Sequence, residues 1–555
     1  MRQPAQIQLT SHRPLEGLRQ AAVYLPVLLA FLLMVPRLVS LHFGLFDNGR
    51  ILVTAEKIAQ GTWYTGADSI EGRFRPIHWL WFTLSYLVGG TNPLWFYIAN
   101  TLALLTIVGG LIILVRAAGG SRLQASLTGL VFLLSGPIME SFMSLKGEVI
   151  QLTLIVISLL AVLLYARARN FLQKITAIVL IFFVLSLAYL TKETSLVLLP
   201  ISLVWYLLSR FWPGYEKEPH RRAARAAYLI ANLLAAALFF ILRKVSISTQ
   251  ISGGTYSGQY TLSLGQLGVS ALRWAGWLVR DFVWVVPLVV LAMVVFISQR
   301  RLKNRYLLID AFIWMGAWIC IYLPWTFMAE YYMLPFALGL AVFVSVCVVE
   351  TIPTLQGRGW RKWVSVVLFC SSLVLLVGAL LNYLTNARVQ LAVDQDDASM
   401  ISYLVQNTEP GSIVLVNIQA PNEYFYEMQT QLGEVYGRSD LKVEVFSSDI
   451  TLPEDTPTVY IVSPYVINQP LLTVRMGVVE ETQRMWNDNL LGFLKDNPRW
   501  QIVFKPADKF HLADINYPRI FCPFVKTHAF CATPVPLIDI REFEYGWTVY
   551  RLIHP

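Results

Sequence analysis

Residues 42–93 contain the side chains best suited to chemistry, and Asp47 is the first of them. Asp47 comes directly after an apolar segment, so its carboxylate should lie where the membrane meets water. The low dielectric there raises the basicity of a carboxylate, which could then accept a proton from a hydroxyl group. The alternative is that Asp47 only caps the amphipathic segment GRILVTAEKIAQG, which begins two residues later at Gly49. Glu71, in the same stretch, is a supporting acid.

Three basic residues of the same stretch could bind a phosphate group. Arg73, Arg75 and His78 surround Pro76 at the start of an apolar run rich in Trp and Phe. The two guanidinium groups could hold the phosphate of a lipid, with His78 in support. The alternative is that these residues anchor the chain at the membrane surface, as Arg and Trp often do.

Lys192 and Glu193 stand side by side at or inside an apolar run of more than 30 residues. Charges in such a run are destabilising by several kcal/mol unless they are paired or face a polar cavity, so this pair predicts a site. Lys192 could bind a phosphate, with Glu193 in support. The alternative is that the two residues pair with each other where one helix ends and the next begins. Glu140 and Lys146, between two apolar runs, are further supporting candidates.

Arg273 and Arg280 lie in a polar, glycine-rich stretch, residues 253–281, whose second half has a helical pattern. Their spacing of seven residues brings the two guanidinium groups near one face of a helix. The stretch could close over a substrate as a lid and contact its phosphate. The alternative is an ordinary surface loop.

Membrane helices are the elements that must position these residues. With 56% hydrophobic and only 14% charged residues, the chain does not have the composition of a soluble protein. Residues 1–384 contain about eleven apolar runs that approach or reach the length of a helix crossing roughly 30 Å of hydrocarbon. Residues 77–88 are also apolar, but we expect them to lie along the interface or to re-enter. The eleven runs are 21–41, 94–115, 123–138, 149–165, 175–190, 194–208, 227–242, 282–297, 307–323, 332–349 and 364–383.

Net charge divides the chain into two predicted domains. Residues 1–384 carry a net charge of +17, and residues 385–555 carry −8. The basic residues of the first part lie in short loops, which indicates membrane orientation rather than nucleic-acid binding. Placing these loops in the cytoplasm puts the Asp47 stretch and the tail on the opposite face. We therefore predict a multi-pass protein of the plasma or inner membrane with an extracytoplasmic C-terminal domain. The basic loops are 2–19, 116–122, 167–174, 210–225, 300–305 and 358–362.

The tail, residues 385–555, alternates strand-like and helix-like segments and is long enough to bury its own core. We predict a soluble α/β domain that ends in an aromatic, proline-rich segment. This domain could dock an acceptor or cover the active face, and the sequence leaves both roles open. Cys522 and Cys531 should form a disulfide if the tail lies in an oxidising compartment.

Several chemistries have no support in the sequence. It contains no Walker loop, nucleotide-binding glycine fingerprint, HExxH motif or CxxC motif. This argues against an ATP-driven pump, a Rossmann enzyme and a zinc peptidase. Seven His residues leave little for a metal cluster. The sequence identifies no certain cofactor, and it leaves a divalent metal open although Asn48 beside Asp47 speaks against one.

Five sequence blocks occur in an order that resembles the GT-C class of integral-membrane glycosyltransferases. Within that class they resemble the O-mannosyltransferases that carry tetratricopeptide repeats, over roughly residues 25–345. The blocks are the acid after the first run, FRPIHWLWFTLSYLVGGTNPLWFYIANTLALL, GPIMESFMSLKGEV, LTKETSLVLLP and AEYYMLPFALGLA. Three features differ from the family pattern: Asn48 replaces the second acid of a pair, Gly136 replaces a His, and the tail lacks helical repeats.

The resemblance implies an inverting transfer of a sugar from a polyprenyl-phosphate donor to an acceptor hydroxyl on the outer face of a cell envelope. The sugar would be a hexose, for example mannose, and the acceptor a protein, lipid or glycan. Asp47 would be the catalytic base. The residues that would bind the donor phosphate are Arg73, Arg75, Lys192, Arg273 and Arg280.

The alternative is a non-enzymatic flippase for lipid-linked sugars or a polysaccharide export component. A flippase should place ionisable residues near the middle of several spans, and only Arg37 and Asp310 have such a position in the sequence. The predicted partners are therefore the lipid-linked donor, an acceptor and membrane lipids, with no nucleic acid.

Overall fold

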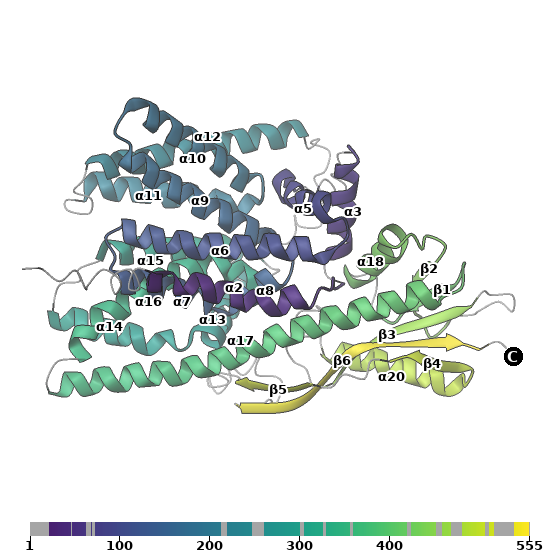
Figure 1. The fold of residues 1–555 in the computed structure, drawn as a ribbon. Helices are drawn as coiled ribbons and strands as arrows, with labels where there is room; N and C mark the ends of the chain where they lie inside the picture. Colours follow the sequence, from purple (N-terminus) through teal and green to yellow (C-terminus); the bar gives the residue numbers. More distant parts are fainter. Residues whose placement is uncertain are drawn as a thin grey trace, which may run out of the picture.

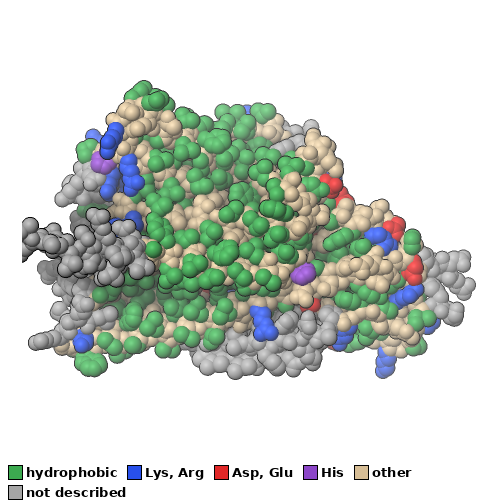
Figure 2. All heavy atoms as spheres, in the orientation of Figure 1, with side chains coloured by type: hydrophobic (Ala, Val, Ile, Leu, Met, Phe, Trp, Pro, Cys, Tyr) green, Lys and Arg blue, Asp and Glu red, His purple; other side chains and the backbone are tan. Residues whose placement is uncertain are grey.

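The computed structural model of the chain consists of a helical bundle and a sheet domain, joined by one long helix (Figure 1). Apolar side chains cover the broad face of the bundle that Figure 2 shows, whereas charged side chains gather toward its ends. The described residues are 21–45, 47–62, 68, 73–212, 219–246, 260–299, 305–325, 329–355, 359–418, 423–450, 458–467, 480–505, 510–515 and 538–553.

The bundle contains the helices that precede the sheet, and most of them coincide with the apolar runs of the sequence. The α-helices are α2 (Leu25–Val39), α3 (Asn48–Ala59), α5 (Pro76–Gly89), α6 (Pro93–Ala117), α7 (Arg122–Leu133), α8 (Gly136–Met143), α9 (Gly147–Arg167), α10 (Phe171–Tyr189), α11 (Leu198–Phe211), α12 (Pro219–Ser246), α13 (Leu264–Phe282), α14 (Val285–Gln299), α15 (Arg305–Tyr322) and α16 (Leu334–Leu355). Short 3-10 turns are η1 (Ala22–Tyr24), η2 (Glu193–Val197) and η3 (Glu330–Met333).

Among the described residues, eight helices are long and apolar enough to cross a membrane, or up to ten if two bent pairs each form one span. The predicted class, a polytopic helical membrane protein with a C-terminal α/β domain, is confirmed. The sequence predicted about eleven spans, somewhat more than the described residues contain. α5 has 14 residues and rises about 21 Å, too little to cross roughly 30 Å of hydrocarbon.

Two apolar stretches are broken in the structure. The run 123–138 divides into α7 and α8, which are bent by 63°. Pro137 lies in the first turn of α8, where its missing amide and its ring prevent the helix from continuing through. α13 and α14 meet at 92°. Trp274 and Trp277 of α13, from the predicted lid stretch, are buried in the bundle core.

α17 (Trp360–Asn407) links the two parts of the molecule. It has 48 residues and is therefore about 72 Å long, much more than a membrane requires. The predicted domain boundary at residue 384 falls inside this helix, so one element serves both parts. Figure 1 shows α17 running along the bundle and then beside the sheet.

The sheet domain combines parallel and antiparallel strands. The strand order is β2-β1-β3-β6-β4, with β5 paired to β6. β1 is parallel to β2 and β3, whereas β6 is antiparallel to β3, β4 and β5. The elements are β1 (Ile413–Val416), α18 (Glu423–Thr430), the π-turn η4 (Gln431–Val435), β2 (Lys442–Val445), β3 (Val459–Ile467), α20 (Glu480–Asp496), β4 (Trp500–Phe504), β5 (Phe510–Ile515) and β6 (Ile538–Leu552).

The core of the sheet domain reaches into the bundle. Its buried side chains include Met400 and Leu404 from α17, and Trp547 from β6. Leu45, two residues before Asp47, is fully buried in this same core. The segment that leads to Asp47 is therefore held by the tail and not only by the membrane helices.

Candidate active site

Asp47 has an unusual backbone conformation. Its φ is 64°, and among the described residues it is the only non-glycine residue with positive φ. Asp tolerates this left-handed conformation better than most residues, but the conformation is still less favourable than the usual ones and must be held by its surroundings. Asp47 precedes α3, yet its side chain makes no capping hydrogen bond to that helix. The capping alternative for its carboxylate is therefore wrong.

Glu427 of α18 supplies the cap that Asp47 does not. Its carboxylate accepts a hydrogen bond from the amide of Gly49 at 2.6 Å and is 3.3 to 3.4 Å from the amide of Arg50. A Cβ atom at Gly49 would lie 2.8 Å from Glu427 Oε2, so glycine is needed for this close approach. Unpaired amides at a helix start favour a carboxylate, which explains why an acid from the tail binds there.

The carboxylate of Asp47 instead faces two cations. Oδ1 forms an ion pair with Arg50, and Oδ2 lies 3.4 Å from Lys146 Nζ. The Lys146 side chain is 6% exposed, whereas that of Asp47 is 24% exposed. A hydroxyl group from solution can therefore reach Asp47, while Lys146 lies deeper.

Two tyrosines connect Lys146 with Lys192. Lys146 Nζ lies 5.0 Å from the ring centroid of Tyr331, and Lys192 Nζ lies 4.5 Å from that of Tyr332 and 5.8 Å from that of Tyr331. All three distances allow attraction between an ammonium group and an aromatic face. Lys192 also forms an ion pair with Glu148, so it is not paired with its neighbour Glu193 as the alternative expected. Burial lowers the pKa of Lys192, and Glu148 opposes that effect.

The loop before α5 is fastened to the start of η2. Glu193 Oε1 accepts a hydrogen bond from the amide of Phe74 at 3.2 Å. Arg75 pairs with Asp68, whose other oxygen accepts the indole N–H of Trp79 at 2.5 Å. Burial alone would raise the pKa of Asp68, but the charge and hydrogen bonds of Arg75 outweigh burial, so the pKa is lowered. Arg75 is thus already engaged within the protein.

The tail holds the segment between α2 and Asp47 from the other side. Arg37 forms an ion pair with Asp394 of α17 at 2.7 Å. Asp397, one turn further along α17, accepts hydrogen bonds from the Leu45 amide at 2.9 Å and from the Trp547 indole at 2.7 Å. Arg37 is thus not stranded within its span. Its partner comes from a distant part of the chain.

Three further predicted site residues lie on α13 and α8, namely Arg273, Arg280 and Glu140. Arg280 pairs with the adjacent Asp281 at 2.8 Å, and Arg273 is exposed on α13. Asp281 explains why residue 136 is glycine, because a Cβ atom there would lie 2.5 Å from the Asp281 carboxylate carbon. Glu140 is half-buried on α8, which packs against η3.

His78 is buried on α5 in edge contact with Trp79 and Phe82. Three of the predicted residues, Glu71, Cys522 and Cys531, lie outside the described residues, so the disulfide remains a prediction.

The described surroundings of Asp47 do not fit a divalent cation. Its carboxylate lies between Arg50 and Lys146, and the side-chain amide of Asn48 is turned inward, donating to the carbonyl oxygen of Gly44 at 3.3 Å. Within the described part of the chain, no group of three metal-ligating side chains comes together.

The candidate site residues predicted from the sequence did not include four contributors to the cluster. Tyr331 and Tyr332 were part of a recognised block, and an aromatic pair directly before a span was the available signal. Glu427 gave no local signal, because its role depends on helix α3, more than 360 residues away. Glu148 was visible beside Lys146, but no sequence pattern pairs it with Lys192.

Comparison with known proteins concerns the fold. The crystal structure of ArnT from Cupriavidus metallidurans bound to undecaprenyl phosphate superposes with a TM-score of 0.50 and 16% identity, covering 87% of this chain and 96% of that one. The archaeal oligosaccharyltransferase AglB from Archaeoglobus fulgidus, in complex with an inhibitory peptide and a dolichol-phosphate, has a TM-score of 0.49 and 10% identity, covering 82% and 70%. No family model and no curated protein sequence matches this chain.

The O-mannosyltransferase branch therefore remains a prediction, whereas the membrane fold of the GT-C class, expected from the order of sequence blocks, is confirmed by the likeness to ArnT.

Proposed function

We propose that the chain transfers a sugar from a polyprenyl-phosphate donor to an acceptor hydroxyl at the face where Asp47 lies. The observation that carries this proposal is the convergence of Asp47 with Lys146 and Lys192, around the ring of Tyr331. A partly exposed carboxylate near one buried and one half-buried cation suits a reaction in which a hydroxyl loses a proton while an anion departs. The fold shared with ArnT, which was solved with undecaprenyl phosphate, supports a lipid phosphate as the leaving group.

In the proposed reaction, the acceptor oxygen attacks the anomeric carbon of the sugar while the bond from that carbon to the phosphate oxygen breaks. The acceptor proton moves to the Asp47 carboxylate, and the bonding electron pair leaves with the lipid phosphate. Attack from the side opposite to the phosphate inverts the anomeric centre. One base is sufficient for this single displacement.

Cations near the cluster stabilise the departing phosphate in this mechanism. Lys146 and Lys192 are the best placed, because Lys146 is buried beside Asp47 and Lys192 is half-buried against the same tyrosine pair, so both carry their charge in a poorly solvated region. Arg73, Arg75 and the pair Arg273 and Arg280 remain proposed phosphate contacts. The sugar, a hexose such as mannose, and the acceptor belong to the same proposal, as does the extracytoplasmic location of the tail.

The test is incubation of the purified full chain with polyprenyl phosphates that carry different sugars, followed by measurement of released lipid phosphate. Asp47→Asn should reduce release by about 10²-fold or more, since it removes the base but keeps the size of the side chain. Glu56→Gln, a carboxylate-to-amide change on the adjacent helix α3, is the matched control and should retain activity. Loss in Glu56→Gln with activity kept in Asp47→Asn would move the base, and no release from any donor would refute the transferase.

The flippase alternative receives no support from the described contacts. Of the two ionisable residues that stood within apolar runs, Arg37 pairs with Asp394 and Asp310 pairs with Arg225. Paired charges at the ends of the bundle do not form a path through its middle.

A further inference from the structure

Three tyrosine rings meet beside the lysines of the candidate active site. Tyr322 is the last residue of α15, whereas Tyr331 and Tyr332 belong to the η3 turn. The rings of Tyr322 and Tyr332 are nearly parallel, with centroids 4.7 Å apart and an angle of 13° between the rings. Tyr331 meets Tyr332 edge to face, with centroids 4.7 Å apart and an angle of 75°. Tyr322 therefore packs directly on the ring that Lys192 approaches most closely.

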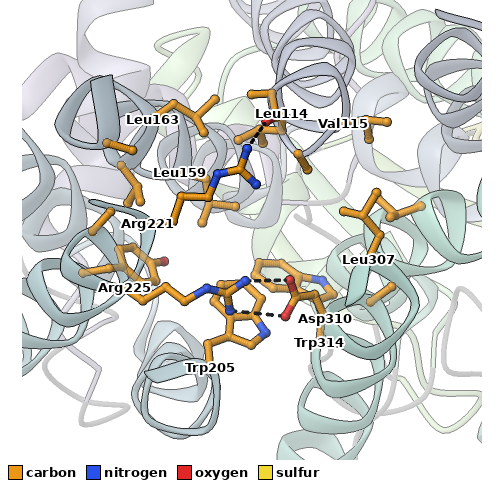
Figure 3. Close-up of a pocket in the computed structure, with 18 of the residues that line it drawn as sticks. Leu114, Val115, Leu159, Leu163, Trp205, Arg221, Arg225, Leu307, Asp310 and Trp314 are labelled. Atoms are coloured by element: carbon orange, nitrogen blue, oxygen red, sulfur yellow. Dashed lines mark hydrogen bonds and ion pairs between the residues drawn. The ribbon is translucent and has the colours of Figure 1, made fainter. Parts of the chain in front are cut away.

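A stripe of aromatic side chains along α15 fixes the ring of Tyr322, which is only 3% exposed. Trp318 and Trp314 precede it by four and eight residues, so the three rings follow one face of the helix. Neighbouring rings of the stripe are 6.3 and 6.0 Å apart. Trp314 also stacks on Trp205 of α11, in the wall of a cavity of about 450 Å³ (Figure 3). The stripe thus leads from that cavity to the active-site cluster, where Tyr322 is its last ring before η3.

The η3 turn depends on such support because it is short. It has four residues, and a 3-10 turn of this length makes few hydrogen bonds of its own. The positions of its side chains must therefore come from packing against other elements. The chain that follows η3 is tied to α15 as well, since Trp314 Nε1 donates to the carbonyl oxygen of Pro335 at 2.7 Å. α15 thus holds both the ring of Tyr332 and the backbone just after it.

The Lys192 ammonium group lies between two partners with different consequences for its charge. Glu148 of α9 forms an ion pair with it, which neutralises the charge. The Tyr332 ring, 4.5 Å from Nζ, attracts the ammonium group without neutralising it. A lysine side chain is long and flexible, so its partners decide where the charge lies. If the ring of Tyr332 moved away, Glu148 alone would direct Lys192.

We propose that Tyr322 is a positioning residue for the sugar transfer: by stacking on Tyr332, it keeps Lys192 where its charge can meet the departing lipid phosphate. This inference rests on the proposed function. Tyr322 acts through Tyr332 and needs no contact of its own with donor or acceptor. The flat ring carries the effect, because stacking requires overlap of the rings and not the hydroxyl group. A side chain without a ring would leave Tyr332 free to tilt.

The first measurement is the release of lipid phosphate by variants of the full chain, as a function of donor concentration. Tyr322→Leu should lower kcat about tenfold and change KM by less than about twofold, because the charge of Lys192 is needed most as the phosphate departs. Tyr322→Phe keeps the ring and should behave as the wild type does. Phe132→Leu is the matched control, since Phe132 is a fully buried aromatic residue on α7, which packs against α6 and α16. It should leave kcat unchanged.

The second measurement does not depend on activity. Acetic anhydride acetylates free amines, and mass spectrometry gives the rate at Lys192, whose side chain is 16% exposed. Measuring that rate from pH 8 to 10 separates access to the amine from its ionisation. Tyr322→Leu should acetylate several-fold faster than the wild type, because the ring that covers the ammonium group is no longer held. Tyr322→Phe and Phe132→Leu should acetylate at the wild-type rate.

The two measurements keep the two proposals apart. Faster acetylation in Tyr322→Leu, with no release of lipid phosphate by the wild type, would refute the transferase but support the control of Lys192 by Tyr322. Equal kcat and equal acetylation in the Leu and Phe variants of Tyr322 would overturn the positioning role. Equal effects in Tyr322→Leu and Phe132→Leu would overturn it too, since they would show only a loosened core. If Tyr322→Leu fails to fold, Tyr322→Met, whose flexible side chain adapts to gaps, replaces it in both measurements.

Discussion

Glu427 should make the stability of the whole chain depend on pH near neutrality. Its side chain is buried against the start of α3, close to Asp47. Burial and the negative charge of Asp47 raise its pKa from 4.5 to about 7, although the amides of Gly49 and Arg50 favour the ionised form. Because the folded pKa lies above the unfolded one, the folded chain holds an extra proton between these two pH values. Its stability must therefore fall as pH rises from about 4.5 to about 7.

The change Glu427→Gln removes this dependence and gives its size. A rise of about 2.5 in pKa, at about 1.36 kcal/mol for each pH unit, corresponds to about 3 kcal/mol of unfolding free energy. A glutamine side-chain oxygen can still accept the hydrogen bond from the Gly49 amide. At pH 5 the variant and the wild type should therefore have similar stability. At pH 8 the variant should be more stable, by up to about 3 kcal/mol.

The measurement is thermal unfolding of the purified chain in detergent, followed by tryptophan fluorescence at intervals from pH 4.5 to 8.5. Glu434→Gln is the matched control, because Glu434 is on the adjoining η4 turn but is 51% exposed and pairs with Lys57 at the surface. That control should shift the unfolding temperature little at any pH. If the difference between Glu427→Gln and wild type does not change with pH, Glu427 does not titrate between pH 4.5 and 8.5. A wild type that is more stable at pH 8 would show that the amide contacts outweigh burial.

Two further substitutions separate structural from functional roles. Arg75→Ala should lower both donor turnover and stability, the latter by about 3–5 kcal/mol, because it leaves the buried carboxylate of Asp68 without its partner. The double change with Asp68→Asn should restore stability, and turnover that also recovers would exclude a phosphate contact by Arg75. Gly49→Ala should destabilise the chain by about 1–3 kcal/mol, since its Cβ would lie 2.8 Å from Glu427 Oε2. Gly109→Ala on α6, where a Cβ meets nothing within 4 Å, is the control for thermal unfolding.

Local patterns predicted most elements of the fold because each depends on its own residues. Long apolar runs correspond to membrane helices, and alternating segments of the tail correspond to β1, β2, β3 and β4. β6 was missed, because its segment contains several charged residues and Gly546 and was not recognised as a strand. It is held in place by pairing with three other strands. Such a strand is stabilised by distant partners rather than by its own pattern.

In the candidate site, too, local patterns identified individual residues but not the distant partners that hold them. The sequence singled out Asp47, Lys146 and Lys192 because charges next to apolar runs are costly, and the structure brings them around Tyr331. It could not show that Arg75 is held by Asp68, since a charge pattern does not reveal which charges are already neutralised. Partner identity depends on the packing of helices, and that information is not local.

The contact between the tail and α3 explains how a carboxylate at a helix start can remain available for proton transfer. An Asp at the N-cap position normally directs its oxygen to the first amides of the helix, which lowers its basicity. Here Glu427 occupies those amides, and Asp47, held at φ 64°, turns its carboxylate toward Arg50 and Lys146. Glu427 of the tail thus caps helix α3 in place of Asp47. Within the proposed mechanism, the sheet domain is then part of the catalytic machinery, because without it the base would be free to cap its own helix.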